Sequence, residues 1–404
     1  MLTKRLKADE KGIEHAAEIL KKGGIVAIPT ETVYGLAASA YDENAVKKVF
    51  EAKGRPQDNP LIVHIADIED LKTVAGDIPD SAYITAQKFW PGPLTMIFKR
   101  TDKIPASVSA GLDTVAVRMP SDKTARAIIK KSVPLAAPSA NPSGEESPKD
   151  AGKALEYFDG KINAVIDGGT CGLGRESTII DMSKPPYRIL RQGALPAEDI
   201  ADALVDRMKI VGITGGTGCG KTTALQELEA MGALVLDCDA IYHELLESSA
   251  ELLSEIEKRF PDTVQDGKLN RKALGAVVFA DSAALGDLNA ITHKYVGLEL
   301  QRRLREFAMT GGTLAAIDAI ELFSSGINGR CFKTVAVISN KENRIKRIMA
   351  RDGITREYAL LRIAAQHDDG YYAERCDYTL YNNADMDSFR NDCRQLFKEM
   401  FSNG

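Results

Sequence analysis

The sequence has few of the features that mark secreted, membrane or metal-binding proteins. Its six cysteines are scattered over 404 residues, without a C-x-x-C pair or a cysteine–histidine cluster. This argues against a disulfide framework and against a structural zinc site. No apolar run approaches the ~18 residues that a membrane-spanning helix needs, and the N-terminus lacks the apolar segment of a signal peptide. We therefore expect a cytoplasmic protein that does not bind membranes.

The chain also lacks an excess of positive charge. Its formal net charge is −5 at pH 7, with 27% charged and 44% hydrophobic residues, as in ordinary globular proteins. This excludes a broadly basic nucleic-acid-binding protein, although a local positive groove remains compatible with it. At ~150 residues per domain, the length is sufficient for two or three domains with separate cores.

The most informative stretch is a glycine-rich loop in the second half of the chain. The apolar run Ile210–Ile213 leads into Gly215–Thr222, which matches the G-x-x-x-x-G-K-[ST] phosphate-binding pattern. Glycines let backbone N–H groups turn toward phosphate oxygens, and the helix that follows adds the dipole of its N-terminus. Lys221 is predicted to hold the β- and γ-phosphates, and the Thr222 hydroxyl to bind Mg²⁺. The alternative, a solvated glycine-rich turn, is disfavoured by the strand–loop–helix context.

We therefore expect this loop to bind a nucleoside triphosphate, ATP. The residues predicted to surround it are Gly215, Gly216, Thr217, Gly218, Cys219, Gly220, Lys221, Thr222 and Thr223.

The position of this loop indicates how the chain is organised. In most small kinases such a loop follows the first strand of its domain, so the residues before it should form a domain of their own. Met208 and Lys209 directly precede the predicted strand, and residues 197–207 are polar and helical rather than rich in glycine, serine and proline. We predict a fusion of two enzymes, with domains at residues 1–206 and 207–404.

Residues 1–206 are predicted to form an open twisted α/β sheet. Short apolar runs flanked by turn residues indicate strands, and they alternate with helical stretches. The predicted strands cover residues 25–28, 61–65, 94–98, 115–117, 135–137, 164–166 and 178–180. The predicted helices cover residues 13–22, 44–53, 81–89, 122–131 and 150–158.

Four local features of this domain could carry chemistry, and each also has a plain structural explanation. Lys53 and Arg55 surround a helix-ending glycine, where cations often only complement the helix dipole. The turn-rich segment 138–144 is typical of an ordinary loop, yet its serine and asparagine could bind phosphate or ribose. His64 is more often a satisfied core histidine than a ligand, and Thr30–Thr32 could simply cap helices. None of these features decides the function alone.

In their order along the chain, however, the motifs resemble those of the threonylcarbamoyl-AMP synthase (YrdC-like) family. The similarity spans roughly residues 10–205 without a large gap. The matching segments are Ile28-Pro-Thr-Glu-Thr-Val-Tyr-Gly-Leu36, Lys53-Gly-Arg-Pro56, Asn59-Pro-Leu-Ile-Val-His64, Phe89-Trp-Pro-Gly-Pro-Leu-Thr95, Thr114-Val-Ala-Val-Arg118, Pro138-Ser-Ala-Asn-Pro-Ser-Gly144, Glu176-Ser-Thr178 and Ile189-Leu-Arg-Gln-Gly193. The resemblance implies that L-threonine, bicarbonate and ATP react to threonylcarbamoyl-adenylate and pyrophosphate, for N6-threonylcarbamoyladenosine in tRNA.

The resemblance also assigns residues to this reaction. Lys53 and Arg55 would neutralise the triphosphate and the attacking anion, and Arg55 can bind phosphate in a bidentate way. The residues implied around threonine are Thr32, His64, Arg118 and Ser177. Those implied around ATP are Arg55, Asn59, Thr114, Ser139, Ser147 and Arg191, with Asn141 in the same motif. Mg²⁺ is expected on the phosphates, and the implied partners are a separate threonylcarbamoyl transferase complex and, transiently, tRNA.

In the second domain, a predicted strand at 233–236 ends in the segment Asp237–Asp239. Asp239 is expected near the carboxyl end of a parallel strand, where α/β sheets hold their reactive groups. A carboxylate there can accept a proton from a substrate hydroxyl while the glycine-rich loop holds the donor phosphates. The alternative, that both aspartates only cap the next helix, weighs about equally on the residues alone.

Together with the glycine-rich loop, further segments resemble the dephospho-CoA kinase family over nearly all of residues 208–404. They are Asp237-Cys-Asp239, Gly267-Lys-Leu-Asn-Arg-Lys-Ala-Leu274, Val278-Phe279, Asn289-Ala-Ile-Thr-His293, Arg344-Ile-Lys-Arg347-Ile-Met-Ala-Arg351-Asp352, Arg362-Ile-Ala-Ala-Gln366, Cys376-Asp-Tyr and Asn382-Asn383. The resemblance implies a P-loop kinase with a parallel sheet and a helical lid, which transfers the γ-phosphate of ATP to the ribose 3′-hydroxyl of dephospho-CoA. It implies Asp239 as the base and Arg347 and Arg351 at the lid, with Arg271 and His293 on the CoA side.

The second domain departs from its family's pattern at several positions. Cys219 replaces a serine and predicts sensitivity to oxidation, and Lys294 replaces a proline. Ser324 stands where the family has an acidic residue. Residues 368–372 stand where the family usually has a basic residue of the lid. These departures leave open a kinase that acts on another small hydroxyl substrate. For the first domain, the alternative is a tRNA-binding module without synthase activity.

Overall fold

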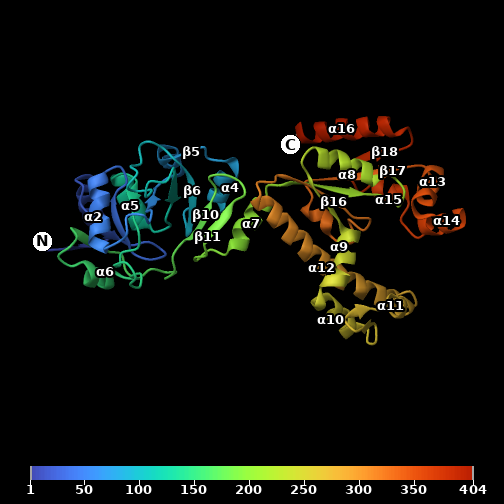
Figure 1. Ribbon diagram of the computed structural model, residues 1–404, viewed down its shortest axis with the longest axis horizontal. Helices are drawn as coiled ribbons and strands as arrows, with labels where there is room; N and C mark the ends of the chain where they lie inside the picture. The colour runs from blue at the N-terminus through green and yellow to red at the C-terminus, as the bar shows by residue number, and fades with distance from the viewer. Residues whose placement is uncertain (1, 403–404) are drawn as a thin grey trace. The chain divides into compact units, whose positions relative to one another are not determined.

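The computed structural model describes residues 2–402, which form two compact α/β units (Figure 1). The first unit ends at Asp206 and also takes in Met309–Gly311. The second unit comprises Arg207–Ala308 and the residues from Gly312 onward. The α/β fold class predicted from the sequence is confirmed in both units.

A mixed sheet forms the centre of the first unit. Its strands are β1 (Lys4–Lys7), β2 (Val26–Ile28), β3 (Gly35–Ser39), β4 (Ile62–His64), β5 (Ala75–Gly76), β6 (Leu94–Arg100), β7 (Thr114–Arg118), β8 (Leu135–Ala136), β9 (Ala164–Asp167), β10 (Thr178–Asp181) and β11 (Arg188–Arg191). Within residues 2–402 they pair in the order β1-β9-β2-β3-β8-β4-β7-β6-β10-β11, with β5 paired to β6. The register places His64 beside Arg118, and Arg118 beside Thr95. Three residues far apart in the sequence therefore meet at one end of neighbouring strands.

Helices cover this sheet, and several begin at an aspartate. They are α1 (Glu10–Lys21), α2 (Glu43–Lys53), α3 (Leu71–Val74), α4 (Asp80–Phe89), α5 (Lys123–Lys131), α6 (Ala151–Phe158) and α7 (Ala197–Val205), with the 3₁₀ turn η1 (Ile68–Asp70). The side chains of Asp9, Asp42, Asp122 and Asp150 accept hydrogen bonds from backbone N–H groups in the first turns of their helices. Helix α2 ends at Gly54, whose φ of 60° lies in the left-handed region that glycine tolerates.

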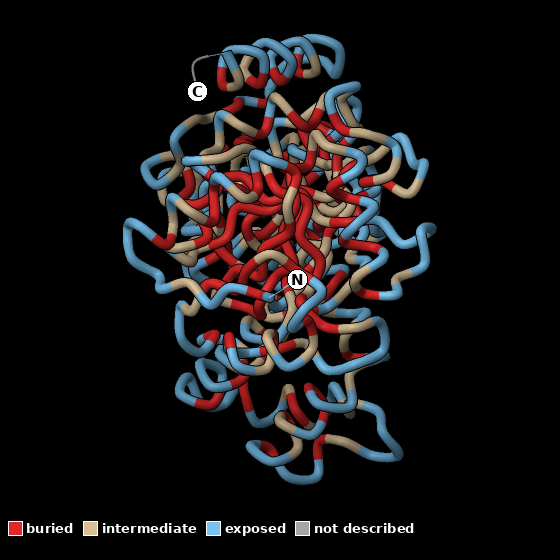
Figure 2. Tube along the Cα trace, turned by 90° about the vertical axis from the view of Figure 1, so that its left-hand side faces the viewer, coloured by how far each residue is buried: buried red, intermediate tan, exposed pale blue. Residues whose placement is uncertain are grey.

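The core of the first unit lies between the sheet and its helices. Leu20 of α1 and Ile128 of α5 pack with Ile28 and Ile166 of the sheet in one fully buried cluster. Figure 2 shows buried residues gathered in the interior, with exposed residues along the outer turns. Burial of this apolar surface, at about 25 cal/mol per Å², is the main force that holds the helices on the sheet.

Four strands of the first unit are not predicted by the sequence pattern: β1, β3, β5 and β11. The clearest case is β3, because it lies between the predicted strand 25–28 and the predicted helix 44–53 and belongs to neither. Its sequence, Gly-Leu-Ala-Ala-Ser, has weak β propensity, yet all five residues are buried. The strand exists because β2 and β8 pair with it from both sides.

The second unit contains a parallel sheet, as the sequence predicts. Its strands are β12 (Lys209–Thr214), β13 (Leu234–Asp237), β16 (Leu314–Asp318), β17 (Lys333–Ile338) and β18 (Tyr378–Tyr381). Their order is β13-β16-β12-β17-β18, and every adjacent pair among these described strands is parallel. The glycine-rich loop therefore leaves the central strand at the edge where all carboxyl ends gather. A separate hairpin joins β14 (Val264–Gln265) and β15 (Lys268–Leu269).

Helices cover this sheet, and some of them build a second core that is smaller than the core around the sheet. The helices are α8 (Lys221–Ala230), α9 (Cys238–Ser248), α10 (Ala250–Arg259), α11 (Arg271–Val278), α12 (Ser282–Met309), α13 (Lys341–Asp352), α14 (Arg356–Ala364), α15 (Asp369–Ala373) and α16 (Met386–Ser402), with the 3₁₀ turn η2 (Ile327–Arg330). Helices α8 and α16 pack beside each other against the sheet, where Leu228 and Phe389 join its core. Leu252, Phe260 and Leu274 belong to the separate cluster of α10–α12.

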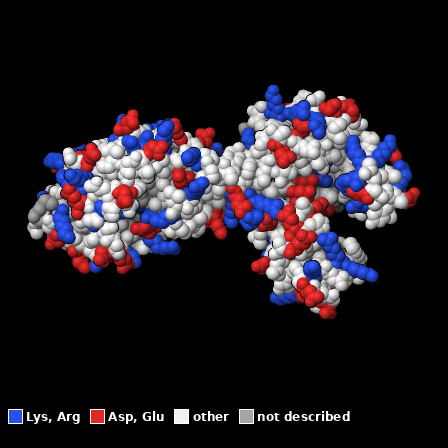
Figure 3. Space-filling model, viewed as in Figure 1, with Lys and Arg blue, Asp and Glu red and all other residues white. Residues whose placement is uncertain are grey.

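The distribution of charged side chains on the surface agrees with the nearly balanced numbers of basic and acidic residues in the sequence. On the faces visible in Figure 3, basic and acidic side chains are interspersed over both units. Within residues 2–402, no helix combines the length and the apolar character that crossing a bilayer requires.

Candidate active sites

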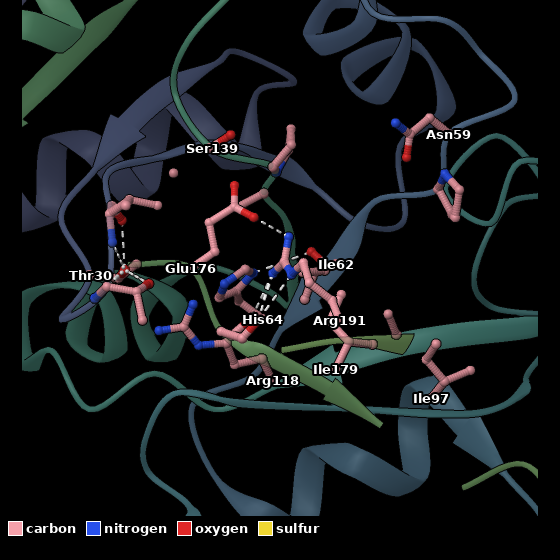
Figure 4. Close-up of a pocket in the computed structure, with 18 of the residues that line it drawn as sticks. Thr30, Asn59, Ile62, His64, Ile97, Arg118, Ser139, Glu176, Ile179 and Arg191 are labelled. Carbon is pink, nitrogen blue, oxygen red and sulfur yellow. Dashed lines mark hydrogen bonds and ion pairs between the residues drawn. The ribbon is translucent and has the colours of Figure 1, made fainter. Parts of the chain in front are cut away.

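A pocket of about 260 Å³ opens in the first unit (Figure 4). Strands β4, β6, β7, β10 and β11 and the loops that follow β2 and α2 contribute to its walls. Eight of the twelve site residues predicted for this unit line the pocket: Thr32, Arg55, Asn59, His64, Arg118, Ser139, Ser177 and Arg191. The structure thus brings residues implied for threonine and residues implied for ATP into one cavity.

Arg118 is held at the pocket by a carboxylate that the sequence analysis did not assign. Its Nη2 lies 2.7 Å from Glu31 Oε1, and its Nε donates to Gly92 O at 3.3 Å. The second oxygen of Glu31 accepts from the backbone N–H of Ser121 at 3.1 Å. Both side chains of the pair are largely buried. The guanidinium is therefore fixed in direction before any ligand carboxylate arrives.

His64 is a neutral side chain in this pocket. Its Nδ1 lies 3.2 Å from Ile62 O, and because a carbonyl oxygen can only accept, Nδ1 must carry the hydrogen. Burial, helped by the nearby Arg118 charge, lowers the pKa of His64 to about 3. The free Nε2 is consequently an acceptor, suited to an ammonium or hydroxyl group of a ligand.

Hydroxyl groups complete the polar side of the pocket. The Thr30 and Thr32 side-chain oxygens are 2.8 Å apart, and Thr30 Oγ1 also donates to Val33 O. Thr95 Oγ1 and Ser177 Oγ are 2.7 Å apart and fully buried. These pairs fix the hydroxyl orientations next to His64 and Arg118.

The other side of the pocket carries guanidinium groups. Arg55 donates from Nη2 to Asn59 Oδ1 at 2.6 Å, which holds both predicted residues in one place. Arg191 donates from Nε and Nη2 to Ser177 O at 3.1 and 2.9 Å, and its Nη1 pairs with Glu176. Burial lowers the pKa of Arg55 and of Arg191, and the Glu176 charge opposes this shift. Planar guanidinium groups in such a setting suit phosphate oxygens.

Lys53 lies behind this wall and not on it. Its side chain is 3% exposed, and its Nζ contacts the backbone oxygens of Ser139, at 2.5 Å, and of Asn141. Burial, with the Arg55 charge beside it, lowers the pKa of Lys53 to about 7. The amine therefore holds segment 138–144 in place, and that segment presents Ser139 to the pocket.

Three further predicted residues, like Lys53 within the described chain, do not line the pocket: Thr114, Asn141 and Ser147. Asn141 donates its side-chain amide to Pro142 O and Glu145 O, at 2.9 and 2.7 Å. Ser147 donates to Glu176 Oε1 at 3.3 Å, while Thr114 opens β7 opposite Lys99. Glu176, which belongs to one of the sequence motifs, was not among the predicted site residues.

In the second unit, close packing requires the glycines of the phosphate loop. Gly215, Gly218 and Gly220 have φ values of 134°, 78° and 102°. A Cβ on Gly215 would lie 2.2 Å from the backbone oxygen of Val337, and one on Gly218 would lie 2.9 Å from that of Arg344. The loop can therefore approach its neighbours, and a phosphate, only without side chains at these positions.

Lys221 and Asp318 face each other at the end of the loop. Lys221 Nζ lies 3.1 Å from Gly215 O and 3.6 Å from Asp318 Oδ1. Asp318 Oδ1 is buried without a hydrogen-bond donor among residues 2–402. Burial raises the pKa of Asp318 to about 6, against the opposing charge of Lys221. Asp318 was not among the predicted site residues, although an acid at the carboxyl end of a strand beside β12 is a usable signal.

The two aspartates after β13 have different environments. Asp237 Oδ1 accepts hydrogen bonds from Asp239 N and Ala240 N, at 2.9 and 3.1 Å, and so caps α9. Asp239 stands in the first turn, and burial together with the Asp237 charge raises its pKa, while Lys221 opposes the shift. The capping role thus falls to Asp237, and the Asp239 carboxylate remains for a ligand.

Arginines of α13 hold the phosphate loop from the other side. Arg347 donates from Nη1 to Gly218 O and Cys219 O, both at 3.3 Å. Arg344, which the sequence analysis quoted without a role, is buried and donates from Nε to Thr217 O at 3.0 Å. Arg351 instead pairs with the neighbouring Asp352 at 2.7 Å and is exposed.

Of the remaining predicted residues of this unit, Cys219, Thr222 and Thr223 belong to the loop and the start of α8, whereas Arg271 opens α11 and His293 lies in α12. Thr222 is exposed at the start of α8, and Thr223 is buried behind it. Arg271 lies 3.4 Å from a His243 ring nitrogen, and burial lowers the pKa of His293. Cys219 is almost fully buried, and burial raises the pKa of its thiol. A buried thiol of raised pKa is unreactive, which speaks against the sensitivity to oxidation expected from the sequence.

Fold and sites define the class of each unit before any comparison. The second unit is a nucleotide-binding kinase domain with a phosphate loop on a parallel sheet, and the first is an α/β domain with a guanidinium-lined pocket for an anionic ligand. The family described as "Telomere recombination", the Sua5/YciO/YrdC family, matches residues 18–193. The family "Dephospho-CoA kinase" matches residues 209–388. The chain belongs to both families, one through each unit.

Curated relatives match one unit each. The threonylcarbamoyl-AMP synthase of Pyrococcus abyssi is 52% identical over 197 residues, which cover 48% of this chain and 58% of that protein. A putative threonylcarbamoyl-AMP synthase of Mycobacterium tuberculosis is 32% identical over 203 residues, covering 50% of this chain and 94% of that protein. The dephospho-CoA kinase of Geobacter sulfurreducens is 33% identical over 196 residues, covering 48% of this chain and 100% of that protein. The chain thus spans only 58% of the length of the P. abyssi relative.

Proposed function

We propose that the chain is a bifunctional cytoplasmic enzyme. Its first unit condenses L-threonine, bicarbonate and ATP to threonylcarbamoyl-adenylate, which a separate transferase complex uses to modify tRNA. Its second unit phosphorylates the ribose 3′-hydroxyl of dephospho-CoA with ATP. The observation that carries the proposal is the shared pocket of the first unit, where His64 and Arg118 lie beside Arg55 and Arg191. Family membership of both units supports it.

In the first unit, residue chemistry divides the pocket into two halves. Arg118 and the Ser177 hydroxyl suit the carboxylate of threonine, and His64 Nε2 suits its amine or hydroxyl. Arg55, Asn59, Ser139 and Arg191 would hold the nucleotide. A carbamate oxygen attacks the α-phosphorus and pyrophosphate leaves, so negative charge concentrates between the two guanidinium groups. Fixed cations there lower the barrier mainly through positioning and charge neutralisation.

In the second unit, Asp239 would accept the proton of the attacking hydroxyl while Lys221 and the loop N–H groups hold the β- and γ-phosphates. Asp318 Oδ1, which is buried and forms an ion pair with Lys221 Nζ at 3.6 Å, and the Thr222 hydroxyl are oxygen ligands that fit Mg²⁺. These two residues would hold the ion. When bound, it neutralises charge on the phosphates of ATP.

The synthase activity is tested by pyrophosphate release from the purified chain without tRNA. We expect release that depends on both L-threonine and bicarbonate, because both enter the adenylate. The alternative for this unit is a tRNA-binding module in which Arg55 and Arg191 contact backbone phosphates. Such a module would bind tRNA with a steep salt dependence and release no pyrophosphate.

The kinase activity is tested by mass spectrometry of the chain with Mg-ATP and dephospho-CoA. We expect CoA and ADP, and no turnover with pantetheine, adenosine or shikimate. The Asp239→Asn variant should lose CoA formation and keep pyrophosphate release by the first unit. Turnover only with another acceptor would identify the second unit as a kinase of a different small hydroxyl substrate, the alternative that its departures from the family pattern allow.

A further inference from the structure

Among the described residues that line the pocket of the first unit, Glu176 is the one carboxylate. It projects into the guanidinium side of the cavity, toward Arg191 (Figure 4). One carboxylate oxygen pairs with Arg191 Nη1, and the other accepts from Ser147 Oγ at 3.3 Å. Its side chain is 40% exposed, so that a ligand in the pocket can reach it.

Glu176 is close enough to influence every cation on this side. Its negative charge opposes the burial-driven lowering of the pKa at Lys53, Arg55 and Arg191. The backbone of Glu176 is also fixed. Its carbonyl accepts from Ala194 N at 2.8 Å, and a Cβ on Gly193 would lie 2.3 Å from the same oxygen. Only the side chain of Glu176 can therefore respond to a ligand.

This arrangement is unfavourable for a bare polyphosphate. Phosphate oxygens that bind Arg55 and Arg191 would compete with Glu176 for Arg191. The Glu176 carboxylate would then lie next to the negative charge of the phosphates. At 4 Å, two like unit charges near a protein surface repel by about 4 kcal/mol. A divalent cation removes the conflict, because it binds carboxylate and phosphate oxygens together.

We infer that Glu176 is a metal ligand of this nucleotide site, and that a divalent cation joins its carboxylate to the phosphates of ATP. The Ser147 hydroxyl, which does not line the pocket, donates to Glu176 Oε1 at 3.3 Å and so holds this carboxylate in position. In the absence of metal, the same carboxylate weakens the binding of free polyphosphates to this wall of the pocket. The inference rests on the proposed function, in that the pocket must bind ATP. It gives the first unit a metal ligand that the sequence analysis, which found no carboxylate cluster there, did not provide.

The test measures the affinity for ATP by titration calorimetry, with Mg²⁺ and with EDTA. The full chain carries Lys221→Ala and Thr222→Ala, so that the phosphate loop of the second unit is disabled, and a stoichiometry of one ATP per chain verifies this. We expect Mg²⁺ to tighten binding in this parent by at least about tenfold. In the added Glu176→Gln variant, the ratio should fall to about twofold or less, mainly because metal-free ATP binds more tightly.

Two measurements separate a metal ligand from a residue that only holds Arg191. Glutamine can still hydrogen-bond Arg191, so a purely structural role predicts the same Mg²⁺ ratio in parent and variant. Mn²⁺ electron paramagnetic resonance with ATP reports the metal directly, and Glu176→Gln should lose the protein-bound Mn²⁺ signal that Glu176→Asp retains. The control is Glu146→Gln, an exposed glutamate that pairs with Lys149 and should behave like the parent.

The outcomes distinguish the inference from the function on which it rests. An unchanged Mg²⁺ ratio and Mn²⁺ signal in Glu176→Gln would overturn the metal-ligand role, while ATP binding in the parent would still support the nucleotide site. Failure of the parent to bind ATP at all, with or without metal, would overturn the proposed function and this inference together.

Discussion

At the scale of single residues, Lys53 is distinguished by its burial against backbone oxygens. A neutral lysine amine has two N–H groups, and the structure offers two acceptors, Ser139 O and Asn141 O. The neutral amine of Lys53 can therefore donate both of its hydrogens, and the ammonium form is not required for these hydrogen bonds. Its contacts position segment 138–144, whereas Arg55 and Arg191 line the pocket itself.

This burial predicts a pH-dependent stability. The folded pKa of Lys53 is about 7, below its ordinary value of 10.5, because burial disfavours the ammonium form. Between these values the unfolded chain binds a proton that the folded chain does not, so the free energy of unfolding rises with pH. The slope from one such group is at most about 1.4 kcal/mol per pH unit. Urea unfolding of the parent and of Lys53→Met at pH 7, 8 and 9 measures it.

We expect Lys53→Met to flatten the pH dependence over this range. Lys47→Met, at an exposed position of the same helix, is the matched control and should keep the slope of the parent. Equal slopes in the parent and in Lys53→Met would mean that Lys53 remains charged in the folded chain.

The residue scale also shows what sequence reasoning can and cannot find. The phosphate loop was predictable because its groups are consecutive and their spacing is set by the phosphate. Glu31 and Asp318 were missed because their partners, Arg118 and Lys221, are remote in sequence and meet only through strand register. Glu176 was quoted in a motif, but its role depends on contacts made by a neighbouring strand.

At the scale of elements, the connection after β11 packs closely against the segment that carries Glu176 and Ser177 of the pocket. Gly193 follows this strand, and a Cβ there would lie 2.3 Å from Glu176 O and 2.4 Å from Ser177 C. The approach is possible only without a side chain. One glycine therefore sets where two pocket residues stand.

Gly193→Ala should consequently displace the Glu176–Ser177 segment. We expect a loss of about 1–3 kcal/mol in unfolding free energy, as for overpacking, and at least a tenfold fall in pyrophosphate release. Gly76→Ala in β5 is the matched control, because its Cβ would meet no described atom within 4 Å. A Gly193→Ala variant as stable and active as Gly76→Ala would show that the segment relaxes without consequence.

Helix α13 has a corresponding function in the second unit. Arg347 holds carbonyl groups of the phosphate loop, whereas Arg351 pairs with Asp352 at the surface. Arg347→Ala should raise the KM for ATP in the kinase reaction and lower the melting temperature, because the loop loses its support. Arg351→Ala should change stability by less than about 1 kcal/mol, as for exposed ion pairs. Steady-state kinetics with thermal melts checks both.

A fall in kcat without a change in KM or stability would instead place Arg347 at the transferring phosphate, as the family resemblance implies. The kinetic constants and the stability of Arg347→Ala, compared with those of Arg351→Ala, thus show whether Arg347 positions the loop or contacts the reacting group.

The strands and helices that could be predicted from the sequence are those with a strong local pattern of apolar and polar residues. Strands such as β6 and β12 are rich in large apolar residues, and the helices carry caps and amphipathic faces. Strand β3 was missed because its glycine and alanines favour no strand on their own. Its pairing with β2 and β8 supplies the stability that local propensity does not.

At the scale of the whole molecule, each unit has a sheet and a core of its own. The strands of the mixed sheet all precede Asp206, and those of the parallel sheet all follow it within the described chain. Two cooperative cores on one chain imply two unfolding transitions, because each loses its packing as a separate event. The two proposed substrates then provide selective probes, since L-threonine and dephospho-CoA should each bind one unit only.

Calorimetry of the intact chain tests this expectation. A ligand at about 100 times its Kd adds about 2.7 kcal/mol to the unit that binds it, and this should raise that unit's melting temperature by about 5–10 °C. We expect L-threonine to shift one transition and dephospho-CoA the other, while Mg-ATP shifts both. A single transition that moves with either substrate would show that the two cores unfold as one, and the two activities would then depend on each other's ligands for stability.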